Sequence, residues 1–334
     1  MSTSFKRAHR HGLAHRRRQH GAALLAAMLT VMLVATFSAA ALWQQWRASE
    51  VEAAERGRVQ AAWVLVGALD WSRLILREDA MTGGPDHLAE PWAVPLAEAR
   101  LTSFLSAEKN VASDNLEGLP DAFLSGRIVD AQSKLNILSL VDGNKPVPAS
   151  VATFTRLFNI LGLPASELNA MTASLLRATA TDAGGDGGAA PLMPQEMSQL
   201  TWLGLSPSTV AALEPYVTVL PVRTRLNINT ASAEAISASL PSLSISDARQ
   251  VVEKRTRAFF RQISDANRVL PNVGSQFNAA QHDVKTQYFE VHGRLRIDRT
   301  WVDERSLLQR DGNTVKTIWR HRGAGLAAAA QAKP

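Results

Sequence analysis

Two carboxylates in a glycine-rich run are the best candidates in this sequence for holding a metal ion. Asp182 and Asp186 lie in the run Asp-Ala-Gly-Gly-Asp-Gly-Gly at 182–188. Calcium takes about six to eight oxygen ligands, and two carboxylates with neighbouring carbonyls supply only part of such a shell. Glycine-rich segments are also typical of flexible linkers. We interpret the run as a linker first and as a calcium loop second.

The residues that usually carry out acid–base or nucleophilic chemistry show no catalytic spacing. The sequence has no phosphate-binding loop, nucleophile elbow or HExxH helix. Half of its 8 histidines precede residue 21, and the others, His87, His282, His292 and His321, lack the spacing of metal ligands. The chain has no cysteine, which excludes disulfides and thiolate metal sites. The sequence therefore predicts neither an enzyme nor a bound cofactor.

A third pattern is suited either to nucleic-acid binding or to helix packing. It consists of Leu226, Asn227, Ile228, Asn229, Thr230 and Ala231. It is similar to the opening of helix-hairpin-helix DNA-binding modules, whose hairpin glycines let backbone N–H groups meet a phosphate. The corresponding turn here, at 243–245, contains no glycine. We therefore expect no nucleic acid, and we predict a packing motif in which Thr230 or Ser232 caps the next helix.

The basic character of the chain is confined to its beginning. The isoelectric point of the sequence is near 10.0. Six basic residues and no acidic ones lie in the first 21 positions: Lys6, Arg7, Arg10, Arg16, Arg17 and Arg18. Without these six, basic and acidic residues are equal in number. The charge therefore indicates a leader segment rather than a nucleic-acid-binding surface.

The residues after this leader form a candidate membrane span. Residues 22–42 contain no charged side chain, and a helix of that length is about 30 Å long, enough to cross a bilayer. Because basic residues favour the cytoplasmic side, we predict a single pass with the body of the protein outside. Apolar residues continue at helical spacing over 43–80, which predicts one long stem helix. The alternative is a secretory signal cleaved after the small residues 38–41.

The rest of the chain predicts an α+β fold. Strands are expected at 126–132, 287–297, 301–310 and 313–321, with Asp311-Gly312 as the turn of a hairpin. We expect a small antiparallel sheet on the amphipathic half of the stem, and a short helix at 96–107. Helical spacing recurs at 151–161, 165–177, 194–202, 206–216, 231–240 and 246–260, which predicts a separate all-α domain.

The leader and span resemble those of pilins and pseudopilins. The run Arg16-Arg17-Arg18-Gln19-His20-Gly21 before Ala22 looks like the signal that prepilin peptidase cuts after the glycine. The resemblance implies cleavage after Gly21 and methylation of Ala22 as the mature amino terminus. Most members carry a glutamate where this chain has Ala26. Its absence resembles the K-type minor pseudopilins of the type II secretion system.

Two motifs in the body are similar to the same K-type family. One is a strand ending in Asp130 followed by Asn136, Ile137 and Leu140, and the other is the motif at 226–231. The resemblance implies a type IV pilin-like fold with a large inserted all-α domain. It also implies a place at the tip of a periplasmic pseudopilus that helps to export folded proteins. Relatives hold calcium near the loop at 182–188, which is shortened here.

The resemblance further implies a set of partners and a location. We expect I- and J-type minor pseudopilins, the major pseudopilin, prepilin peptidase and inner-membrane lipid as partners. The amino terminus would lie in the cytoplasm and the body in the periplasm of a bacterium. A membrane-tethered DNA-uptake protein and a type IV pilus minor pilin are the alternative functions. The expected parts are a leader (1–21), a transmembrane helix (22–42), its amphipathic continuation (43–80), a pilin-like body (81–132 and 284–322), an inserted helical domain (133–283) and a disordered tail (323–334).

Overall fold

A computed structural model describes most of the chain. The described residues are 20–103, 121–180, 191–270, 274, 276–297 and 300–324. The arginine cluster at 16–18, the two carboxylates Asp182 and Asp186, and the expected tail beyond residue 324 lie outside these ranges. The chain divides into two compact units, residues 1–59 and 60–334, which we describe separately.

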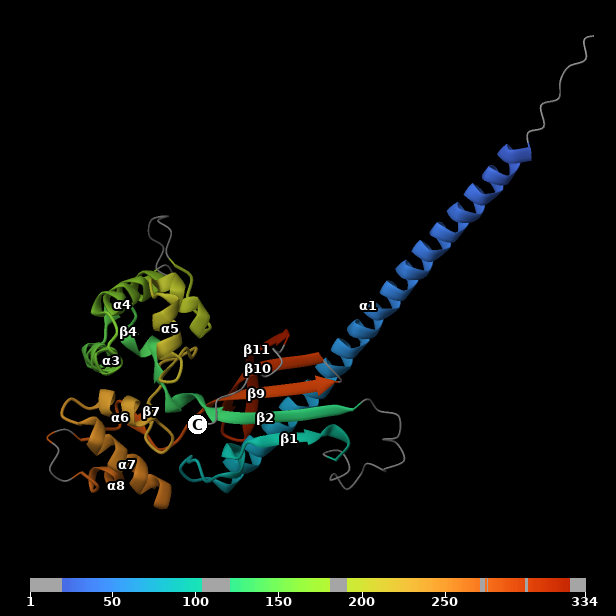
Figure 1. The fold of residues 1–334 in the computed structure, drawn as a ribbon. Helices are drawn as coiled ribbons and strands as arrows, with labels where there is room; N and C mark the ends of the chain where they lie inside the picture. The colour runs from blue at the N-terminus through green and yellow to red at the C-terminus, as the bar shows by residue number, and fades with distance from the viewer. Residues whose placement is uncertain are drawn as a thin grey trace, which may run out of the picture. The chain divides into compact units, whose positions relative to one another are not determined.

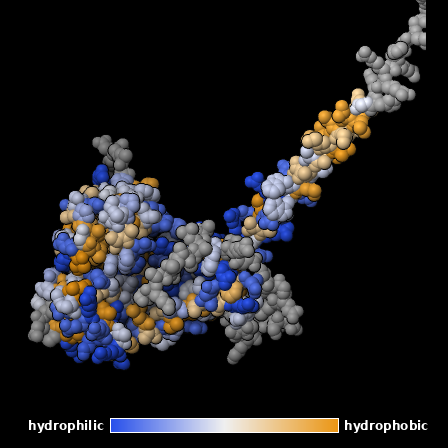
Figure 2. Space-filling view, in the orientation of Figure 1, coloured by the Kyte–Doolittle hydropathy of each residue, from blue (hydrophilic) through white to orange (hydrophobic). Residues whose placement is uncertain are grey.

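The described part of the first unit is helical. Helix α1 begins at His20 and ends at Thr82, so it also contributes to the second unit. Every side chain from 21 to 56 is exposed, and Figure 2 shows apolar side chains gathered on the first part of this helix. Among the described residues, one helix, Gly21–Thr82, is long and apolar enough to cross a membrane. The predicted long stem helix is present.

The second unit contains a five-stranded antiparallel sheet (Figure 1). Its strands, in spatial order, are β1 (Leu96–Arg100), β2 (Ala122–Asp130), β9 (Tyr288–Ile297), β10 (Thr300–Asp311) and β11 (Thr314–Ala324). The neighbours β2 and β9 are separated in sequence by residues 131–287, which include six α-helices of this unit. The small antiparallel sheet expected from the sequence is confirmed.

Apolar residues of α1 pack against one face of this sheet. Leu65 lies in one buried cluster with Leu124 and Leu295, and Leu76 in another with Phe289 and Leu308. Burying a large aliphatic side chain stabilises a fold by about 1.5–3 kcal/mol. The apolar positions of 60–82 therefore hold the stem to the sheet.

Two local expectations for the sheet are wrong. Residues 96–100 form β1 instead of the start of a helix, and only 101–103 are helical in the described part of 96–107. Leu-Ala-Glu-Ala-Arg favours a helix by propensity, but the half-buried Leu96 packs against the core and the strand pairs with β2, so tertiary contacts override propensity. In the hairpin, Asp311 pairs with Thr314, so the loop residues are Gly312, with φ of 52°, and Asn313.

The residues between β2 and β9 pack around their own core. The helices are α3 (Pro148–Leu161), α4 (Ala165–Ala180), α5 (Pro207–Leu213), α6 (Ala233–Ser239), α7 (Ile245–Arg257) and α8 (Ile263–Asn267). Residues predicted as a helix at 194–202 instead form a 3-10 helix, Met197–Leu203, and α8 was not predicted. Short strand pairs join β3 (Leu135–Asn136) to β6 (Val217–Thr218), β4 (Val141–Asp142) to β5 (Lys145–Pro146), and β7 (Leu226–Asn227) to β8 (His282–Asp283).

Candidate functional site

A buried carboxylate lies at the end of β2. Asp130 is 2% exposed, and its Oδ1 accepts a hydrogen bond of 2.7 Å from the backbone N of Gln132, where the chain turns into a short 3-10 helix. Aspartate favours such turns because its side chain can bond the backbone two residues on. The strand thus ends on a charged group that needs further donors.

Three side chains distant in sequence supply those donors. Thr230 Oγ1 lies 2.5 Å and Asn227 Nδ2 lies 2.8 Å from Asp130 Oδ2, and Thr286 Oγ1 lies 2.7 Å from Asp130 Oδ1. Buried charges are tolerated when hydrogen bonds replace the lost water. The structure therefore joins Asp130 directly to the motif at 226–231.

The second asparagine of that motif points to a different element. Asn229 Oδ1 accepts from the backbone N of Phe260, and its Nδ2 donates to the backbone O of the same residue, both at 2.9 Å. Ala231 is fully buried, and Ser232 caps α6 by accepting a 3.1 Å hydrogen bond from Ala235 N. Of the two predicted caps, Ser232 is therefore the one used. The motif ties the end of β2 to the segment after α7.

The turn between α6 and α7 is part of this packing. Leu240 and Leu243 are buried in the large core, and Ser244 caps α7 by accepting from Asp247 N at 3.1 Å. A nearby cation, Arg255, is only 8% exposed and donates to the backbone O of Ile228 at 2.6 Å. The predicted packing role of the motif agrees with these contacts.

We call the hydrogen-bonded residues Asp130, Asn227, Thr230 and Thr286 the joint, and burial shifts the pKa values of the ionisable groups in and beside it. Burial raises the pKa of Asp130 to about 6, against the lowering effect of the hydrogen bonds from Thr230, Thr286 and Gln132. It also lowers the pKa of Arg255 to about 10, while the charge of Asp130 acts in the opposite direction. Both groups are therefore costly to bury and depend on their partners.

A second carboxylate is coupled to the first through Thr286. Asp86 is 3% exposed, and its Oδ2 accepts from the backbone N of Thr286 at 2.7 Å. Arg310, near the end of β10, pairs with both Asp86 and Asp79, which lies in the last turn of α1. Burial raises the pKa of Asp86, and the charge of Arg310 lowers it. The ion pairs fasten the end of α1 and the following loop to the sheet.

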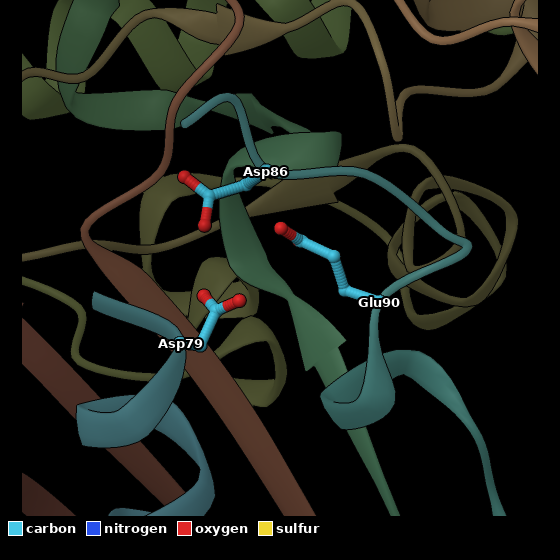
Figure 3. A group of neighbouring side chains, drawn as sticks. All are labelled: Asp79, Asp86 and Glu90. Carbon is cyan, nitrogen blue, oxygen red and sulfur yellow. The ribbon is translucent and has the colours of Figure 1, made fainter. Parts of the chain in front are cut away.

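Glu90 completes a group of three carboxylates with Asp79 and Asp86 (Figure 3). One oxygen of each lies within 4.8 Å of the others, and a cavity of about 530 Å³ adjoins them. Glu90 Oε2 accepts from His87 N at 2.9 Å and from Trp92 Nε1 at 2.7 Å, and burial raises the pKa of Glu90 to about 7. The guanidinium of Arg310 already pairs with two of these carboxylates. We interpret the group as an ion-pair network rather than a metal centre.

The predicted processing residues lie apart from this joint in sequence. Gly21, Ala22 and Ala26 are exposed on the first turns of α1, and a Cβ built on Gly21 would meet no atom within 4 Å. Sequence reasoning missed Thr286 as a partner of Asp130 and Asp86 as a partner of Asn227, and it missed the ion pair of Arg310 with Asp79. No local pattern marks these contacts, because they span up to 231 residues.

Comparisons with known proteins agree on one family. Residues 133–222 and 226–285 match two family models described as type II secretion system (T2SS), protein K. The chain is 28% identical over 334 residues to the type II secretion system protein K of Pseudomonas aeruginosa, covering 93% of this chain and 95% of that protein. It is 28% identical over 343 residues to the protein K of Pectobacterium carotovorum subsp. carotovorum, covering 92% and 98%.

A solved structure has the same fold. One chain in the crystal structure of the GspK-GspI-GspJ complex from the enterotoxigenic Escherichia coli type 2 secretion system superposes with a TM-score of 0.59 at 18% identity. The match covers 81% of this chain and 99% of that chain. The antiparallel sheet packed on α1 and the hydrogen bonds between Asp130 and the motif at 226–231 agree with these matches, and the chain belongs to the type II secretion system protein K family.

Proposed function

We propose that this protein is a membrane-anchored minor pseudopilin at the tip of a periplasmic pseudopilus, where it helps to export folded proteins. The observation that carries the proposal is the two-part stem. Residues 21–56 of α1 are exposed along their length and include the uncharged run 22–42, whereas buried residues of 60–82 pack on the sheet. A helix of this kind can be stored in a bilayer and later packed against sister helices.

The same proposal covers the processing and orientation of the chain. Prepilin peptidase would cut after Gly21 on the cytoplasmic side, and Ala22 would be methylated. The basic residues before the cut favour a cytoplasmic leader, so the body would lie in the periplasm, anchored in the inner membrane. Residues 133–283 would form the inserted helical domain.

Ala26 supports a position at the end of a filament. A carboxylate at membrane depth costs about 2.5–3.5 kcal/mol and needs a partner such as the amine of an adjacent subunit. Alanine at this position avoids the cost of burying a carboxylate, and it also removes the contact with the amine of the adjacent subunit. A subunit without that contact suits a tip better than a repeating shaft.

The expected partners are the I- and J-type minor pseudopilins and the major pseudopilin. The similar chain of known structure is part of a GspK-GspI-GspJ complex, which supports the first two partners. The polar residues of the joint bond one another and hold elements together, so we propose an assembly role rather than an enzymatic one. Co-expression with I- and J-type subunits and purification from membranes should give a ternary complex. Recovery of this chain alone would argue against the assembly.

Processing has its own test. Gly21→Ala, or a charged residue at this position, should leave the leader attached, because the peptidase site accepts a residue without a Cβ. Intact mass of the membrane-extracted protein measures cleavage and methylation together. Gly57→Ala is the matched control, since Gly57 also lies on α1 with no atom within 4 Å of a built Cβ. A mature mass in the Gly21 variant would contradict the proposed signal.

A further inference from the structure

Two tryptophans lie directly after the uncharged run of α1. The rings of Trp43 and Trp46 have centroids 5.5 Å apart and are tilted by 42°. Their residues are 63% and 57% exposed. Among the described residues, neither indole N–H has a protein acceptor. Two large rings with free donors on a helix surface need a surrounding that is apolar on one side and rich in acceptors on the other.

Their place in the sequence identifies that surrounding. The run 22–42 is about 30 Å long as a helix, which matches the hydrocarbon core of a bilayer. Trp43 is the next residue, and Trp46 follows one turn later. Arg47 and Glu50 are the first charged residues after the run. The pair thus occupies the one or two turns over which the chain changes from uncharged to charged.

At this boundary the membrane offers the apolar contacts and the hydrogen-bond acceptors that the two indole rings lack in the described part of the protein. Tryptophan is enriched at membrane–water interfaces, where its ring lies against acyl chains and its N–H meets lipid carbonyls, phosphates or water. Arg47 beside Trp46 can extend its guanidinium to a lipid phosphate while its stem stays in apolar surroundings.

We propose that Trp43 and Trp46 form the interfacial anchor of α1, seated at the level of the phospholipid headgroups on the side where the residues after Arg47 emerge. The inference rests on the proposed membrane anchor and adds the depth at which α1 is held. The pair fixes the position of the stem along the bilayer normal, so that 22–42 stays in the hydrocarbon core.

Quenching by brominated lipids tests this depth. The full chain is reconstituted into phosphatidylcholine–phosphatidylglycerol vesicles whose acyl chains carry bromine either near the headgroup or near the methyl end. The difference in fluorescence between the wild type and the Trp43→Phe/Trp46→Phe variant isolates the pair among the 8 tryptophans. Trp63→Phe is the matched control, because Trp63 is 70% exposed on the same helix but follows the charged residues 50–58.

The outcomes separate the inference from the anchor itself. We expect the fluorescence of the pair to be quenched severalfold more by shallow than by deep bromines, and that of Trp63 to be quenched by neither. A protein that floats with the vesicles but whose pair is quenched most by deep bromines, or by neither set, overturns the inference and keeps the anchor. A protein that fails to float with vesicles overturns the anchor and the inference together.

Discussion

Thr230 Oγ1 donates a 2.5 Å hydrogen bond to Asp130 Oδ2, although 100 residues separate the two in sequence. The contact joins the end of a sheet strand to the start of the segment that carries α6 and α7. Asn227 of the same motif donates to the same carboxylate oxygen at 2.8 Å. A motif that resembles the opening of a DNA-binding hairpin thus makes hydrogen bonds within the protein, which connect it to the end of β2.

The hydrogen bond from Thr230 should be worth a measurable part of the stability. Thr230→Val keeps the shape but leaves one donor fewer on a buried carboxylate, so the free energy of unfolding should fall by about 1–3 kcal/mol. Urea unfolding of the purified full chain in mild detergent measures the change. Thr256→Val is the matched control, because Thr256 lies exposed on α7 and bonds only the backbone O of Val252. Equal losses in both variants would show that the bond to Asp130 adds nothing.

The titration of Asp130 should appear in the pH dependence of stability. Its pKa rises from 3.8 to about 6 on folding, so between these values the folded state holds the proton more tightly than the unfolded state. The stabilisation of the folded state by the protonated Asp130 is therefore complete below pH 3.8 and is lost as the pH rises through about 6. Its upper limit is about 3 kcal/mol of unfolding free energy. Asp130→Asn cannot titrate, so the wild type should lose stability relative to this variant between pH 4 and 7. Parallel profiles would contradict the expectation.

Removing the cation of the second network should be more damaging. Arg310→Met leaves Asp79 and Asp86 without their shared partner, and breaking a buried ion pair costs about 3–5 kcal/mol. Thermal and urea unfolding should both report the loss, and adding Asp86→Asn should recover part of it. Arg296→Met is the comparison, because the pair of Arg296 with Glu98 is more exposed and should be worth about 1 kcal/mol or less. Similar losses for both arginines would argue against a special role for Arg310.

Two glycines should respond oppositely to alanine. A Cβ on Gly126 in β2 would lie 2.9 Å from the backbone O of His292 in β9, so Gly126→Ala should destabilise the sheet by about 1–3 kcal/mol. Gly67 lies inside α1 with nothing within 4 Å of a built Cβ, so Gly67→Ala should be neutral or add up to about 1 kcal/mol. Unfolding free energies of the two variants test the contrast. A neutral Gly126→Ala would mean that the strands can separate slightly at no cost.

Elements with strong local patterns could be predicted from the sequence. The uncharged run and its helical continuation predicted α1, and alternation of apolar residues predicted β9, β10 and β11 to within a few residues. The absence of glycine at 243–245 predicted that the motif at 226–231 packs inside the protein, and the cap by Ser232 and the buried leucines are consistent with this prediction. In each case the signal lies in residues close together in the chain, and the physics of one helix or hairpin is enough to interpret it.

Tertiary structure alone decided the rest. Residues 96–100 have helical propensity but form an edge strand, because pairing with β2 and partial burial of Leu96 outweigh a preference of a few tenths of a kcal/mol per residue. No local pattern links Asp130 to Thr286, or Arg310 to Asp79, since these pairs are 156 and 231 residues apart. A buried charge is costly unless a hydrogen bond or an opposite charge compensates it, but only the fold decides which partners lie close enough to do so. Local patterns were therefore enough to predict α1 and the strands β9, β10 and β11, whereas β1 and the partners of the buried carboxylates depend on contacts made only in the folded chain.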